Sequence, residues 1–174
     1  MHLVAEKVMV MKMILVIEMI LCCVLFSIMV ILGTRKNPLS GLHNMPVALQ
    51  ERVSSLEQYQ NVEVVHTRKR ILKKLPALIM LTIIFVLMIY ASGARSFKQG
   101  FINTFLLWSV IKLYVVFVLD CGWLAHTPSA WIPGTEDMKE CYQDYVFYMK
   151  SIPRSLIAGL VVAALVGLAI EIIV

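Results

Sequence analysis

The chain has 174 residues, of which 60% are hydrophobic and only 16% charged, with a formal net charge of +5 at pH 7. Soluble domains carry about a quarter of charged residues, so this composition excludes an ordinary soluble globular protein. Long apolar runs without the alternation of a β-barrel strand predict helices, because a helix satisfies its own backbone hydrogen bonds in lipid. The sequence therefore predicts an all-α integral membrane protein.

Four apolar segments follow one another along the chain, at about 13–33, 75–93, 101–123 and 155–174. A helix of about 20 residues crosses a hydrocarbon core of about 30 Å, so each segment is long enough to span. The first is longer than the core of a signal peptide and no small-residue cleavage site follows it, so we expect it to be retained. We predict one membrane domain over 1–174, built as a bundle of four transmembrane helices with short helices in its two long loops.

The lysine and arginine residues predict the orientation of this bundle. The loops at about 34–74 and 124–154 carry eleven of them, and the opposite side carries four. By the positive-inside rule both long loops are cytoplasmic and both termini lie outside, as expected of a bacterial inner-membrane protein. Anionic lipid headgroups explain the positive charge, so membrane lipids are expected partners and nucleic acid is not.

The first long loop contains a helix signal. Asn44 is a suitable N-cap, with Pro46 in the first turn. Leu49, Val53 and Leu56 then share one helix face at i, i+4 and i+7. We expect this face to lie on the membrane surface or against the bundle.

The second long loop allows two interpretations. In the first, Thr135 caps a short helix that begins at Glu136, and Glu136 and Asp137 favour its dipole. In the second, His126 joins Asp120, Glu136 and Asp137 in a catalytic acid/base site or a weak metal site. Oxygen-rich ligands with one imidazole suit magnesium, manganese or iron, but no known metal spacing such as HExxH is present.

The third apolar segment contains a lysine, Lys112, about halfway along. At about 100° per residue, five positions fall within a sector of about 80° that can face the bundle: Ser109, Lys112, Val116, Asp120 and Trp123. An unpaired ammonium at the bilayer centre costs about 2.5–3.5 kcal/mol on insertion scales, so Lys112 is expected to have a partner. Glu18 is the first candidate by depth and Glu171 the second. The pair either fixes helix packing or forms part of a proton or solute pathway.

The last apolar segment carries small residues at helical spacing. Gly159, Ala163 and Gly167 recur every four residues on one face, which allows close approach of a second helix in lipid. The partner is either another span of this chain or the same span of a second copy. Four spans enclose little volume, so a homo-oligomer or a larger membrane complex is expected.

Motifs do not decide the function. No histidine stands inside a span for haem ligation, and no nucleotide-binding motif or CxxC pair of a zinc site occurs, so any cofactor stays open. Cys121 and Cys141 are predicted to face the reducing cytoplasm. Three functions remain: transport or an accessory role at the intramembrane charges, an enzyme acting on an amphipathic substrate at the cytoplasmic face, or a structural scaffold.

Overall fold

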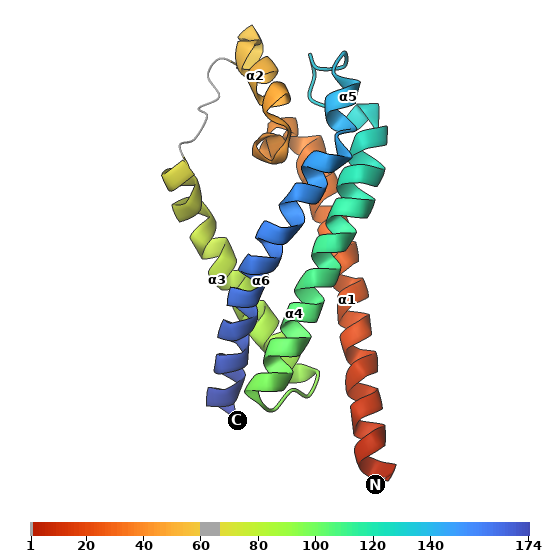
Figure 1. Cartoon of the computed structure of the whole chain (residues 1–174), viewed down its shortest axis with the longest axis vertical. Helices are drawn as coiled ribbons and strands as arrows, with labels where there is room; N and C mark the ends of the chain where they lie inside the picture. Colours follow the sequence, from red (N-terminus) through yellow and green to blue (C-terminus); the bar gives the residue numbers. More distant parts are fainter. Residues whose placement is uncertain (1, 60–66) are drawn as a thin grey trace. The chain divides into compact units, whose positions relative to one another are not determined.

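The computed structural model describes residues 2–59 and 67–174, without the side chains of 2–5, 7, 8, 40, 67–75 and 77. Within this part of the chain every regular element is a helix and no strand occurs. The predicted all-helical class is therefore confirmed. The α-helices are α1 (His2–Lys36), α2 (Val47–Ser55), α3 (Thr67–Ala91), α4 (Phe97–Tyr114), α5 (Lys139–Tyr142) and α6 (Tyr145–Ile173), shown in Figure 1.

Shorter elements connect these helices. Three are 3-10 helices: η1 (Pro38–Asn44), η2 (Glu57–Tyr59) and η4 (Pro128–Ala130). The fourth, η3 (Val115–Leu124), is a π-helix that continues α4 without a break. A π-helix of ten residues is unusual, because π-type hydrogen bonds mostly occur as single turns inside α-helices.

Three helical stretches are long and apolar enough to cross a membrane: Met9–Lys36, Phe97–Leu124 and Lys139–Ile173. They cover the first and third predicted spans completely and the fourth up to Ile173. In α3 the described apolar stretch, Leu78–Ala91, falls short of a spanning length. The second predicted span, at about 75–93, therefore stays a prediction.

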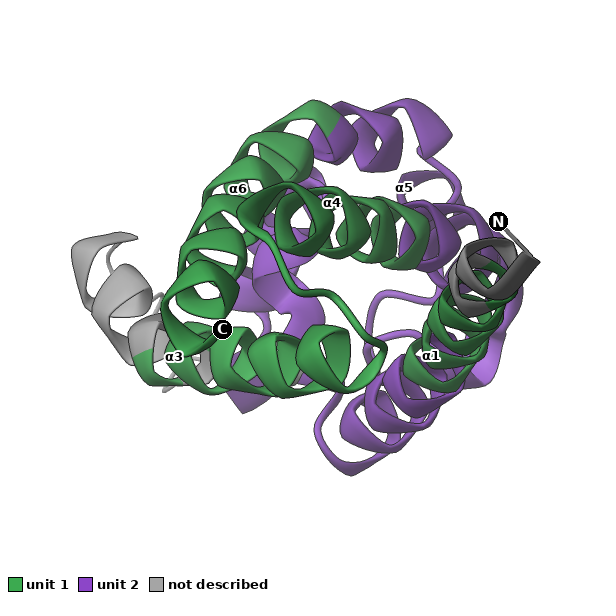
Figure 2. Cartoon of the chain, turned by 90° about the horizontal axis from the view of Figure 1, so that it is seen from below, with its two compact units in different colours: residues 1–22, 65–112, 153–174 green, residues 23–64, 113–152 purple. Residues whose placement is uncertain are grey.

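The chain divides into two compact units (Figure 2). Unit 1 comprises 1–22, 65–112 and 153–174, and unit 2 comprises 23–64 and 113–152. Both are assembled from segments far apart in the sequence, so each unit depends on contacts that no local pattern specifies.

In unit 1, α4 and α6 approach each other through glycine. A Cβ atom on Gly100 would lie 3.0 Å from the Cα of Gly167, and one on Gly167 would lie 3.0 Å from the carbonyl oxygen of Phe97. These distances leave no room for a larger side chain, as expected where two helices pack closely in lipid. Farther along, Gly159 faces the ring of Trp108 in the same way. The small-residue face of α6 thus has its partner in α4 of the same chain.

Trp108 also joins α4 to its neighbours in unit 1. Its indole nitrogen donates a hydrogen bond of 2.9 Å to the carbonyl oxygen of Ser155 in α6. Its ring meets that of Phe85 in α3 edge to face, with centroids 6.3 Å apart. Edge-to-face pairs of this kind contribute about 0.5–1.5 kcal/mol beyond the area they bury.

Unit 2 has its own apolar core, although it lies mostly outside the predicted spans. The buried members come from α2, from the residue Met45 before it and from the segment that ends in α5: Met45, Leu49, Val53, Trp131, Ile132 and Tyr142. Leu49 and Val53 form the buried face of α2. The predicted apolar face of this helix therefore packs against the other long loop.

Two predicted helix starts in unit 2 are wrong. Asn44 is the last residue of η1, and Pro46 occupies the N-cap position of α2. The short helix α5 begins at Lys139, three residues after the predicted start at Glu136. Thr135 does not cap it, because Met138 occupies the N-cap position; the Thr135 hydroxyl instead donates to the carbonyl oxygen of Ile132 at 2.7 Å.

Candidate functional site

Glu18 is the predicted site residue with the most unusual surroundings. It lies in α1, inside the spanning stretch, and its side chain is half-buried. Its Oε2 atom is shielded from solvent and has no hydrogen-bond partner among the described residues. A buried carboxylate oxygen without a partner is costly, because neither water nor a donor replaces its hydration. The site therefore calls for a proton, a cation or a partner on this carboxyl group.

Lys112, the predicted partner of Glu18, is also half-buried and belongs to unit 1 together with Glu18. It lies two residues before the end of α4 and the start of the π-helix. The pairing of Lys112 with Glu18 stays a prediction.

Glu171, the second candidate partner, contacts the start of α4. Its Oε2 accepts a hydrogen bond of 2.7 Å from the backbone N–H of Phe97, the first residue of α4. A carboxylate at this position satisfies an orphan donor and interacts favourably with the helix dipole. Phe97 and Lys112 are fifteen residues apart, or about 22 Å along a helix, so Glu171 is out of reach of Lys112. Its assignment to the charge site was wrong.

The π-helix alters the predicted polar stripe on the third span. The sector was drawn at 100° per residue, which holds for α4 up to Tyr114. From Val115 onward each turn takes up more residues, because the hydrogen bonds of a π-helix reach five residues back. The angles that placed Asp120 and Trp123 in the sector of Lys112 therefore do not hold in this helix, and the polar stripe stays a prediction. Val116 and Leu119 are the buried residues of this helix, and Asp120 is half-buried.

Two buried polar positions were missed from the sequence. The Thr104 side chain is fully buried in unit 1, and its hydroxyl has no partner among the described residues. The Tyr148 side chain in unit 2 is 3% exposed, and its hydroxyl is likewise without a partner there. Asp120 of the π-helix lies within electrostatic range of this hydroxyl. Thr104 could have been found as a polar residue inside an apolar run, whereas Tyr148 resembles an interfacial aromatic.

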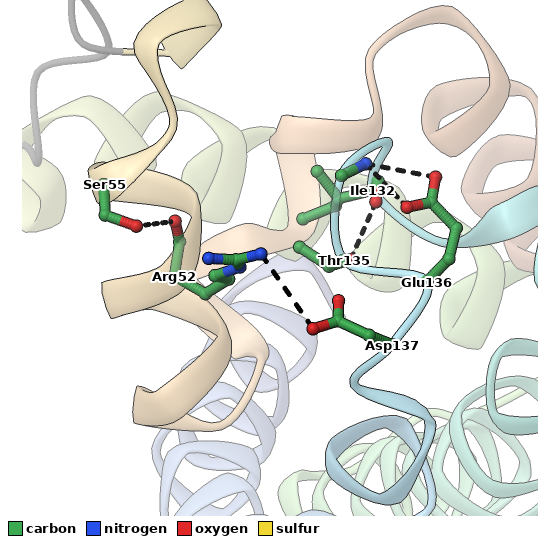
Figure 3. A network of polar contacts seen from close by, with 7 residues as sticks. Arg52, Ser55, Ile132, Thr135, Glu136 and Asp137 are labelled. Atoms are coloured by element: carbon green, nitrogen blue, oxygen red, sulfur yellow. Dashed lines mark hydrogen bonds and ion pairs between the residues drawn. The ribbon is translucent and has the colours of Figure 1, made fainter.

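The proposed loop site is distributed over separate contacts. His126 is exposed; its Nδ1 is 3.0 Å from the carbonyl oxygen of Gly122, and its Nε2 is 3.4 Å from the hydroxyl of Tyr145. Both carboxylate oxygens of Glu136 accept from the backbone N–H of Gly134, at 3.0 and 2.9 Å (Figure 3). Asp137 lies 3.9 Å from the guanidinium of Arg52.

These contacts decide what the loop can do chemically. The three side chains that the second interpretation would bring together each have a different partner. Within residues 2–59 and 67–174, no three His, Cys, Asp or Glu side chains are grouped as a metal site would require. The catalytic and metal roles of these side chains stay predictions.

A closed ring of hydrogen bonds lies at the centre of unit 2. The hydroxyl of Thr135 donates to the carbonyl oxygen of Ile132, and the N–H of Ile132 donates to the hydroxyl oxygen of Tyr142 at 3.0 Å. The hydroxyls of Thr135 and Tyr142 are 2.7 Å apart. Because Thr135 has already used its only proton, Tyr142 must be the donor in this third bond. Each member thus both donates and accepts, and all three side chains are fully buried.

Further bonds close the two long loops onto each other. Trp131 stacks on Tyr142 with ring centroids 4.9 Å apart, and its indole donates to the carbonyl oxygen of Leu124. Gln58 donates to the carbonyl oxygen of Pro133 at 3.1 Å. Gly134 adopts a φ of +89°, which L side chains rarely do, and thereby makes this turn possible. The loops form a folded cap and not two independent tethers.

No protein-family model matches the chain, and no curated protein or solved structure has significant similarity to it.

Proposed function

We propose that the chain is a four-span protein of a bacterial inner membrane, with both termini outside and both long loops in the cytoplasm. The lysine and arginine distribution supports this orientation. α3 supplies the second of the four spans, since basic residues at its start can remain at the headgroups while the apolar part crosses. The packing of both loops into one cap supports their being on the same side, because a common core requires it.

In this membrane, we propose transport at the intramembrane charge site, with the proton as cargo. The observation that carries the proposal is the carboxyl group of Glu18, whose Oε2 lies inside a span without a partner among the described residues. Acidic residues at membrane depth commonly mark ion paths and proton relays. A lone carboxyl group can exchange a proton, whereas a metal ion needs several ligands, and no such group occurs in the described part.

Lys112 acts in this proposal as the counter-charge. When Glu18 releases its proton, the resulting carboxylate needs a nearby positive charge to remain in the membrane. The ammonium of Lys112 supplies that charge through a flexible stem of four methylenes. Oligomerisation or a partner subunit would complete the path, because four spans enclose little volume.

Neither alternative function has a comparable observation in its favour. An enzyme at the cytoplasmic face would need His126, Glu136 and Asp137 around a common ligand, and each has another partner. A scaffold would not need a buried carboxyl oxygen without a partner, because such a group lowers stability.

Proton flux into liposomes tests the proposal. Purified protein is reconstituted into vesicles that contain a pH-sensitive dye, and a potassium diffusion potential drives protons across the membrane. Wild-type vesicles should change their internal pH faster than empty ones, and Glu18→Gln should return the rate to the empty level. The matched control is Glu6→Gln, which removes an exposed carboxylate of the same helix. Equal rates for wild-type and empty vesicles, or full flux in Glu18→Gln, would contradict proton transport.

The counter-charge is tested by stability. Lys112→Met alone should destabilise the protein, and adding Glu18→Gln should recover part of the loss, because removing both charges leaves neither unpaired. Additive losses would dismiss the pairing.

Cysteine labelling tests the orientation. In intact cells Cys121 and Cys141 should be protected from a membrane-impermeant maleimide, and a Ser96→Cys variant should react. The reverse pattern would place both loops outside.

A further inference from the structure

An apolar groove lies between α3 and α6 in unit 1, with a volume of about 460 Å³. Six of its lining residues come from the Leu78–Leu87 stretch of α3, and Leu165 and Ala169 line it from α6. Thr82 is the polar side chain of the lining, and its hydroxyl already donates to the carbonyl oxygen of Leu78 at 2.9 Å. The lining therefore offers dispersion contacts and no free side-chain hydrogen-bond donor, which suits a hydrocarbon chain.

The length of the groove matches one leaflet of a bilayer. Leu78 and Leu87 are nine residues apart, or about 13.5 Å along a helix. Half of a hydrocarbon core of about 30 Å is about 15 Å. An acyl chain that enters at Leu78 would thus reach about the midplane at Leu87.

The sequence that precedes the groove residues of α3 is rich in lysine and arginine. The start of α3 reads TRKRILKK, and Lys74 precedes Leu78 by one helical turn. At about 100° per residue, positions 68 and 69 fall on the half of α3 that carries the groove residues, and positions 73 and 74 fall just beyond its two edges. Each lysine or arginine near the surface contributes about 1 kcal/mol of attraction to anionic lipid.

We propose that this groove is a binding site for an anionic phospholipid, with one acyl chain between α3 and α6 and its phosphate beside the basic start of α3. The lipid would fill the space that α3 and α6 leave between them, and so support α3 as a span. The site is independent of Glu18 and of proton transport, so either proposal can fail without the other.

Lipid retention by the purified protein tests the site. The protein is delipidated in detergent and incubated with equal amounts of palmitoyl-oleoyl phosphatidylglycerol and palmitoyl-oleoyl phosphatidylcholine, which share their acyl chains. Native mass spectrometry then counts the lipids that remain bound. One phosphatidylglycerol per chain should persist, in excess over phosphatidylcholine.

Variants separate the acyl-chain contact from the headgroup contact. Ala169→Phe fills the groove and should abolish retention of both lipids, whereas Ala158→Phe on an exposed part of α6 should not. Lys73→Gln and Lys74→Gln should each lower the preference for phosphatidylglycerol about fivefold while phosphatidylcholine binding remains. Lys98→Gln, at the start of α4, is the control for charge alone.

Several outcomes would overturn the site. Equal retention by Ala169→Phe and Ala158→Phe would show that the lipid binds elsewhere, and no preference for phosphatidylglycerol in wild-type would remove the headgroup contact. Circular dichroism checks the fold; if Ala169→Phe does not fold, Ile83→Trp obstructs the groove from α3 and has the same expected result. Efficient disulfide cross-linking of Ile83→Cys between two chains would assign the groove to a second copy instead.

Discussion

Replacing Tyr142 with phenylalanine removes one oxygen atom from the ring of hydrogen bonds in unit 2. That oxygen accepts from the N–H of Ile132 and carries the proton donated to Thr135. The aromatic ring remains, so the stack with Trp131 at 4.9 Å is kept. The substitution therefore tests the polar ring with little change in apolar packing.

The cost follows from what the substitution leaves behind. The Ile132 N–H loses its acceptor in a fully buried position, where water does not replace it. An unsatisfied buried donor costs about 1–3 kcal/mol, and the bond lost at Thr135 adds about 1 kcal/mol. We therefore expect the free energy that is needed to open the folded cap of unit 2 to fall by about 2–4 kcal/mol.

Hydrogen exchange of the segment 128–135 measures this opening directly. Since 1.4 kcal/mol is a factor of ten, 2 kcal/mol corresponds to amide exchange about 30-fold faster in Tyr142→Phe than in wild-type. The control is Tyr145→Phe, which removes an exposed hydroxyl 3.4 Å from His126 and should change exchange by less than about threefold.

A double substitution checks that the bonds form one ring. Tyr142→Phe combined with Thr135→Val should cost less than the sum of the two single substitutions, because each single change already breaks the bond between these hydroxyls. Unchanged exchange in Tyr142→Phe, or strictly additive costs, would refute the ring.

Two further predictions concern helix contact and surface charge. Gly159→Ala would place a Cβ 2.5 Å from the ring of Trp108, so it should lower stability by about 1–3 kcal/mol in a thermal unfolding assay. The control Gly33→Ala, with nothing within 4 Å of the added Cβ, should be neutral or stabilising by up to about 1 kcal/mol. Equal effects of the two substitutions would argue against close packing of α4 and α6. Arg52→Ala and Asp137→Asn should each lower the free energy of unfolding by less than about 1 kcal/mol, because the ion pair is 3.9 Å long and about half exposed. In high salt the effect should be smaller still. A larger, salt-independent loss would show that this pair holds the loops together.

The sequence by itself determined the helical class, the apolar segments of the spans and the small-residue face of the last span. These properties are local: the length of an apolar run and the 3.6-residue period are read within one segment. The same reasoning identified the apolar face of α2. What this face packs against was outside local reasoning, because its partners Trp131 and Ile132 come from the other loop.

The tertiary structure decided which partners the polar groups have. Glu171 caps α4 at Phe97, which lies 74 residues earlier in the chain, and Thr135 joins a buried ring in place of a helix cap. The segment after Tyr114 forms a π-helix, although its composition fits an ordinary α-helix. A polar side chain bonds to whatever donor or acceptor folding brings within about 3 Å, and residues distant in the chain determine that neighbour.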